Sequence, residues 1–169
     1  MFEIRPAALS EFALLPAVEA EADHAFETLE PPLSIANFAP LGMPADYADA
    51  FHIMVAGRPP VGFVQLEIVD GQAHLEQLSV SPEFARQGIG RSLVTAAKAW
   101  AAEAGFKSMT LCTFAEIPFN GPFYASCGFA EVVSGQWQGE MRARLQHERE
   151  LQMAAVGRRI VMRVDLNQR

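Results

Sequence analysis

The residues between Ser79 and Leu93 offer the clearest chemistry in the chain, and they read SVSPEFARQGIGRSL. Two glycines, two arginines and a glutamine stand there between an expected strand and an expected helix. A glycine-rich turn that opens a helix directs backbone N–H groups at one point, where the helix dipole also favours an anion. This turn is therefore predicted to bind a phosphate group.

Two familiar phosphate motifs do not fit this turn. A Walker A loop needs a glycine where Ala85 stands and a lysine where Arg91 stands, and a dinucleotide-binding turn needs a third glycine where Leu93 stands. The alternative is a tight connection in which the glycines serve geometry alone. The side chains of Arg86, Gln87 and Arg91 favour the anion-binding interpretation instead.

Two groups that can carry protons precede the turn. His74 and Glu76 are two positions apart, so they lie on one face of the expected strand, and Leu78 and Val80 continue that face. The phenol of Tyr124 follows later in the chain and stays protonated at neutral pH, because its ordinary pKa is about 10.

The elements that must position these residues follow from hydrophobic periodicity and turn residues. Asp70 and Gly71 form a hairpin turn, Gly105 closes the main helix, and the strand after it implies a right-handed parallel crossover. The central elements are expected to be strands 51–56, 61–69 and 73–80, helix 91–104 and strand 108–114. The outer ones are expected to be strand 2–5, helix 14–26, a loop with a short helix at 27–47, a short helix ended by Gly128, strand 130–133, helix 140–155 and strand 159–164. The last strand is expected to form a sheet edge or a dimer surface, so a homodimer is one alternative.

Composition limits the class of protein. The 169 residues, of which 50% are apolar, suit a single domain, 1–169. Residues 1–50 carry nine carboxylates and one arginine, a net charge of −8, and residues 51–169 carry +1. This balance favours a cationic small partner over nucleic acid, although a solvated acidic surface is as good an explanation. We see no signal peptide, membrane segment or metal-type cysteine spacing, and we expect a cytoplasmic protein with no metal and two reduced cysteines.

Two motifs in order then resemble one family. RQGIGRSL is similar to the [RQ]xxGx[GA] signature of the GNAT family, the Gcn5-related N-acetyltransferases, and HLEQLSVSPEF before it and NGPFYASCGF after it stand at that family's distances. The strand and turn look particularly like those of serotonin N-acetyltransferases. The resemblance implies an α/β (α+β) GNAT fold, with a mixed sheet of six or seven strands flanked by about four helices.

The resemblance also implies acetyl-CoA as the donor. Its pantetheine arm would lie on the backbone near Leu78 and Val80, with Asn120 and Phe123 beside it, and its pyrophosphate would lie in the turn. The residues expected to bind the cofactor are therefore Leu78, Ser79, Val80, Arg86, Gln87, Gly88, Ile89, Gly90, Arg91, Ser92, Asn120 and Phe123.

The expected catalytic residues are Tyr124, His74 and Glu76. Tyr124 matches the family tyrosine that protonates the departing thiolate. His74 has a suitable ordinary pKa of about 6.5 for a base, but it could equally be a plain hairpin histidine. Glu76 departs from the serotonin enzymes, which have histidine at both positions; it would act as a base through burial or water, or would bind the acceptor's ammonium group.

The function expected on this basis is acetyl transfer from acetyl-CoA to a primary amine of a small cationic molecule. The alternatives are a protein or peptide N-acetyltransferase and a non-catalytic acyl-CoA sensor, but a sensor has no use for an acid and a base.

Overall fold

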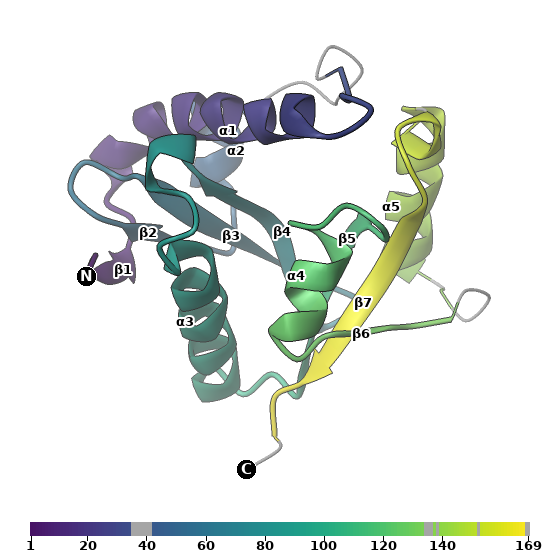
Figure 1. Ribbon diagram of the computed structural model, residues 1–169. Coiled ribbons are helices and arrows are strands. Elements are labelled where there is room, and N and C mark those ends of the chain that lie inside the picture. Colours follow the sequence, from purple (N-terminus) through teal and green to yellow (C-terminus); the bar gives the residue numbers. More distant parts are fainter. Residues whose placement is uncertain (35–41, 134–136, 138, 152, 168–169) are drawn as a thin grey trace. The chain divides into compact units, whose positions relative to one another are not determined.

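The computed structural model describes residues 1–34, 42–133, 137, 139–151 and 153–167. Within these ranges seven strands form one mixed sheet in the order β1-β2-β3-β4-β5-β7-β6 (Figure 1). The strands are β1 (Ile4–Pro6), β2 (His52–Ala56), β3 (Gly62–Val69), β4 (Gln72–Val80), β5 (Ser108–Phe114), β6 (Ala130–Glu131) and β7 (Arg159–Asp165). β4 and β5 run parallel, as the crossover predicts, and β2 pairs antiparallel with β1 and β3, as β7 does with β5 and β6.

Five α-helices accompany the sheet in the described residues, where about four are expected from the sequence. They are α1 (Leu15–Asp23), α2 (Pro44–Ala48), α3 (Ile89–Glu103), α4 (Gly121–Ser126) and α5 (Gly139–Glu150). Short 3-10 helices are η1 (Leu9–Leu14), η2 (His24–Thr28), η4 (Pro82–Phe84) and η5 (Met153–Ala155). The mixed sheet and its helices are the α/β fold that the sequence predicts.

The chain folds into two compact units. Unit 1 comprises residues 1–67 and 76–97, and unit 2 comprises residues 68–75 and 98–169. The strands β3 and β4 and the helix α3 contribute residues to both. The single-domain organisation stays a prediction.

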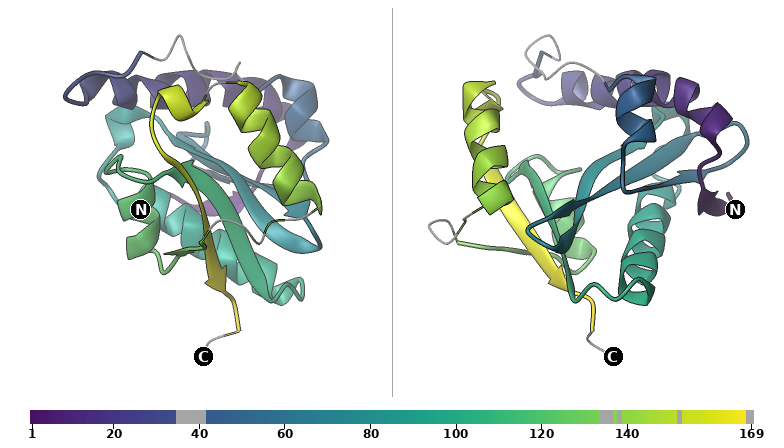
Figure 2. Two further views of the ribbon diagram at one scale, coloured as in Figure 1. Left: turned by 90° about the vertical axis from the view of Figure 1, so that its right-hand side faces the viewer. Right: turned by 180° about the vertical axis from the view of Figure 1, so that it is seen from behind.

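Unit 1 has helices on both faces of its strands. α1 and α2 lie along one face and the first part of α3 along the other (Figure 2). The core on the α1 side holds Leu15, Val18, Tyr47, Ile53, Val55 and Phe63, all buried. On the other side, Leu93 of α3 packs close to Gly62, where a Cβ atom would lie 3.4 Å from the leucine side chain.

Unit 2 is built around β5 and β7, with α4 and α5 on opposite faces (Figure 2). The prediction that the last strand lies at a sheet edge is wrong, because β7 pairs with β5 on one side and with β6 on the other. Three successive side chains of β7, Ile160, Val161 and Met162, are buried. Such a run is typical of a strand that is covered on both faces. On one face Val161 packs against Met141 of α5.

Element boundaries differ most at the helices. α3 begins two residues before the predicted Arg91, because Ile89 is buried one turn before Leu93 and joins the same apolar face. The helix expected over 14–26 is α1 flanked by 3-10 turns. The loop expected over 27–47 falls partly on residues 35–41, outside the described residues, and its short helix is α2.

Candidate active site

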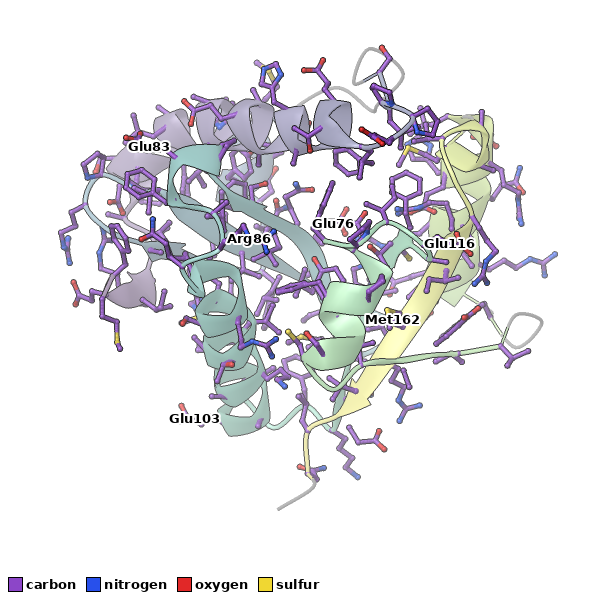
Figure 3. The ribbon with its side chains drawn as sticks, in the orientation of Figure 1. Glu76, Glu83, Arg86, Glu103, Glu116 and Met162 are labelled. Carbon is purple, nitrogen blue, oxygen red and sulfur yellow. The ribbon has the colours of Figure 1, made fainter. Side chains whose placement is uncertain are left out.

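The turn after β4 has the backbone shape of an anion site. Arg86 and Gly88 both adopt left-handed conformations, with φ of 61° and 81°. The N–H of Ser92 donates to the carbonyl of Gly88 over 2.9 Å, so Gly88 is the residue that caps the start of α3. Figure 3 labels Arg86 in this turn.

This geometry fits a phosphate group. The N–H groups in the first turn of a helix have no partner within that helix and carry its positive dipole end. The side chains of Arg86, Gln87, Arg91 and Ser92 are exposed here, so a ligand can reach them, while Ile89 is buried and anchors the first turn. These N–H groups and arginines could together bind the diphosphate of a ligand.

The end of β4 leads straight into the turn. The side chain of Glu76 is exposed on β4 (Figure 3), and those of Leu78 and Val80 are half-buried. Ser79 is only 2% exposed and its hydroxyl accepts a hydrogen bond of 2.9 Å from Gln77. Any contact of Ser79 with a ligand would therefore come from its backbone.

His74 lies in unit 2, in the parallel ladder that joins Ala73–Leu75 to Met109–Leu111. Its ring is 2% exposed, and its Nδ1 atom lies 2.8 Å from the hydroxyl of Thr110, its register partner. Burial, and then the positive charge of Arg144, lower the pKa of His74 to about 3. The ring is therefore neutral near pH 7 and is a much weaker base than an ordinary imidazole.

Tyr124 lies on α4, in unit 2, where a motif at the helix end fixes its ring. Gly128 has φ of 96°, and the N–H of Phe129 donates to the carbonyl of Tyr124 over 3.1 Å. This is a Schellman motif, and it places the ring centroid of Phe129 5.9 Å from that of Tyr124. Tyr124 is 8% exposed, and burial raises the pKa of its phenol above the ordinary range.

The other two residues expected near the cofactor lie on this helix and directly before it. Phe123 is half-buried and its ring centroid lies 5.2 Å from that of Tyr124, so the tyrosine is the more buried of the pair. Asn120 precedes the helix, and its side-chain amide donates to the carbonyl of Phe119 over 3.0 Å. Gly121 is buried against the carbonyl of Ala115, where a Cβ atom would collide.

The predicted residues thus fall into two groups. Unit 1 brings together Glu76, the end of β4 and the turn from Arg86 to Ser92, which are continuous in the chain. Unit 2 brings together Phe123 and Tyr124 on one short helix, with Asn120 directly before it, and places His74 in its sheet. Sequence reasoning missed Thr110 and Lys98, because no local pattern indicates a partner that is 36 or 29 positions away along the chain.

Other site types have less support in the described residues. No group of three or more His, Cys, Asp and Glu side chains there is placed to hold a metal ion. Both cysteines, Cys112 and Cys127, are free thiols. No described helix combines the length and apolar character needed to cross a membrane.

Comparison with known proteins supports the same class. The model of the acetyltransferase (GNAT) family matches residues 15–129. Among solved structures, the PaiA N-acetyltransferase of Thermoplasma acidophilum in complex with coenzyme A superposes with a TM-score of 0.66 at 17% identity, covering 98% of this chain and 99% of that one. The ribosomal-protein-S18-alanine N-acetyltransferase of Escherichia coli gives 0.66 at 20% identity, covering 100% and 96%. Ard1 of Thermoplasma volcanium gives 0.63 at 14% identity, covering 99% of this chain and 99% of that one.

The mixed sheet with one parallel crossover is the fold that these structures share, and the family model, which covers most of the chain, gives the class of protein. The chain belongs to the GNAT family of acetyltransferases, and its donor is acetyl-CoA.

Proposed function

We propose that the protein transfers an acetyl group from acetyl-CoA to the primary amine of a small cationic molecule. The observation that carries the proposal is the continuity of β4: an exposed carboxylate, Glu76, is followed within ten residues by a left-handed turn at the start of α3. One strand would thus present a group for the amine and a site for the donor.

The reaction needs an amine without its extra proton. An ammonium nitrogen has no lone pair, so a base must take its proton before or during attack on the thioester carbon. We propose Glu76 for this role, directly or through one water molecule, because the pKa of about 3 and the burial of His74 make the histidine a poor acceptor. His74 would instead hold β4 to β5 through Thr110.

The reaction also needs a proton for the leaving group. As the new C–N bond forms and the C–S bond breaks, the electron pair of that bond goes to sulfur. We propose that the hydroxyl of Tyr124 donates its proton to this sulfur and later recovers one from solvent. The phenol has a proton to donate, because its pKa, raised by burial, keeps the hydroxyl protonated at every pH near neutrality.

The acceptor is proposed from charge. Unit 1 carries the nine carboxylates of residues 1–50, whereas that segment has one arginine. Such a field attracts cations, which supports a diamine, polyamine or similar amine as the acceptor.

A protein N-terminus or lysine is the second candidate. It is favoured by the fold neighbour whose name specifies the alanine of ribosomal protein S18.

The test is acetyl-CoA consumption, followed as thiol release, across a panel of small amines and short peptides. Turnover with diamines that Glu76→Gln lowers by roughly a hundredfold supports the proposal. Turnover on peptides alone would make the second candidate correct. Thermal stabilisation by acetyl-CoA without any turnover would indicate a sensor.

A further inference from the structure

We propose that Lys98 is a positioning residue for Tyr124, which it holds in place by anchoring the carboxyl end of α4. The Nζ atom of Lys98 donates a hydrogen bond of 2.7 Å to the carbonyl of Cys127, the residue that caps the end of α4. Both residues belong to unit 2. The inference rests on the proposed role of Tyr124 as the proton donor.

The helix α4 depends on contacts of this kind. It has six residues, too few for its own hydrogen bonds to keep it in place. Its start is packed against the backbone of Ala115 through Gly121, which has no side chain to obstruct the approach. Its end bears the negative end of the helix dipole, which a cation at that position stabilises.

Tyr124 lies one turn from this anchored end. Its own carbonyl accepts the N–H of Phe129 in the motif that follows Cys127. The ring contacts with Phe123 and Phe129 are apolar and only weakly directional, whereas a charge-assisted hydrogen bond has a defined length and direction. The bond from Lys98 therefore limits how far α4 can rotate or slide, and with it the phenol hydroxyl.

The composition of the chain allows a clean experiment. The protein has two tyrosines, Tyr47 and Tyr124, and two lysines, Lys98 and Lys107. Lys107 is exposed in the connection between α3 and β5, so Lys107→Met is a matched control. With ¹³C-labelled tyrosine, the full chain should give separate ring signals for the two residues, assigned with Tyr124→Phe.

We expect Lys98→Met to shift the ring signal of Tyr124 and leave that of Tyr47 in place. Lys98→Arg, which keeps a cation of similar reach, should restore the signal, and Lys107→Met should change neither. An unchanged Tyr124 signal in a folded Lys98→Met protein would overturn the proposal.

The kinetic consequence is measured separately. Lys98→Met should lower kcat by roughly tenfold, because a misplaced donor loses its alignment, while the KM for acetyl-CoA stays the same. In the Tyr124→Phe background the same change should have no further effect, whereas an equal loss in both backgrounds would show that Lys98 does not act through Tyr124. If Tyr124→Phe itself leaves kcat unchanged while Lys98→Met shifts the ring signal, the positioning stands and the proposed acid role fails.

Discussion

Tyr124 combines a buried ring with a hydroxyl that keeps its proton. We expect Tyr124→Phe to lower kcat by at least about tenfold, because the thiolate then leaves without a positioned acid. The affinity for acetyl-CoA, measured by calorimetry, should stay within about twofold, since the turn proposed to bind the diphosphate lies elsewhere in the chain. Unchanged turnover would remove Tyr124 from the mechanism.

A matched substitution separates catalysis from stability. Tyr47→Phe removes a hydroxyl that donates to Glu19 over 2.7 Å in unit 1. It should cost about 1 kcal/mol of unfolding free energy without the loss of turnover expected for Tyr124→Phe.

His74 predicts a dependence of stability on pH. Its pKa is about 3 in the folded chain and about 6.5 when unfolded. Well above pH 6.5 the His74 ring is therefore neutral in both states, and it does not make the unfolding free energy depend on pH. As the pH falls below 6.5 the unfolded state takes up a proton that the folded state refuses, and stability should fall by up to about 1.4 kcal/mol per pH unit. Urea unfolding of the wild type and of His74→Asn between pH 7.5 and 5 measures this term.

The difference between the two proteins is the informative quantity. Burial beside Glu19 raises the pKa of Asp23 to about 6, so its protonation in the folded state raises stability as the pH falls, opposite to His74. That contribution is present in both proteins and cancels in their difference. His147→Asn, at an exposed position, is the control. If the unfolding free energy of His74→Asn depended on pH as that of the wild type does, the prediction would be wrong.

The burial of the site residues could not be predicted from the sequence. The spacing of His74 and Glu76 predicts that both lie on one face of a strand. The burial of His74 could not be predicted, because it depends on Thr110 in another strand. Tyr124 is likewise more buried than the neighbouring Phe123, which the sequence alone does not indicate. The Schellman motif brings Phe129 onto the tyrosine, and only the folded helix end shows that contact.

At the scale of elements, the turn between β4 and α3 depends on a left-handed glycine. Gly88→Ala should raise the dissociation constant of acetyl-CoA by roughly tenfold, because alanine resists φ of 81° and the N–H groups that follow would turn away from the diphosphate. In the described residues no heavy atom beyond its chain neighbours lies within 4 Å of an added Cβ atom, so the effect comes from conformation alone.

Gly105 is the matched control for Gly88. It closes α3 with φ of 93°, and an added Cβ atom likewise meets nothing within 4 Å in the described residues. Both alanine variants should lose about 1–2 kcal/mol of stability through the same backbone strain, while Gly105→Ala binds acetyl-CoA as the wild type does. Equal affinities for the two variants would mean that the turn is not the diphosphate site.

Elements with a strong local signal could be predicted closely. The central strands agree with the structure to within one residue at each end, because Asp70 and Gly71 form one turn and the prolines 59 and 60 lie in the other. The position of β7 inside the sheet could not be predicted from the sequence. It depends on the pairing of β7 with β6, a strand of two residues that is too short to show a clear sequence pattern. A glycine-rich turn can be predicted from the residues within it, whereas the order of strands in a sheet depends on residues far apart in the chain.

At the scale of the whole molecule, charge is unevenly distributed along the chain. Unit 1, with the acidic residues 1–50, also contains the arginines 86 and 91 that follow β4. Acidic side chains would attract a cationic amine, and the arginines would attract the anionic donor. Each reactant would therefore meet charge of the opposite sign.

This arrangement predicts that salt affects acceptors according to their charge. Raising NaCl from about 0.05 to 0.5 M shortens the screening length severalfold, so the KM for a diamine should rise by about threefold or more. A simple alkylamine, with one positive charge, should show a smaller rise. Initial rates at saturating acetyl-CoA measure both.

Two charge reversals test whether the acidic segment is responsible. Glu21 is exposed on α1, within residues 1–50, and Glu103 is exposed at the end of α3, outside that segment (Figure 3). Glu21→Lys should raise the KM for the diamine and weaken its salt dependence, while Glu103→Lys, with the same change in net charge, should leave both as they are. Equal effects of the two variants would assign the attraction to net charge alone, and a KM insensitive to salt would make a protein N-terminus or lysine the better candidate for the acceptor.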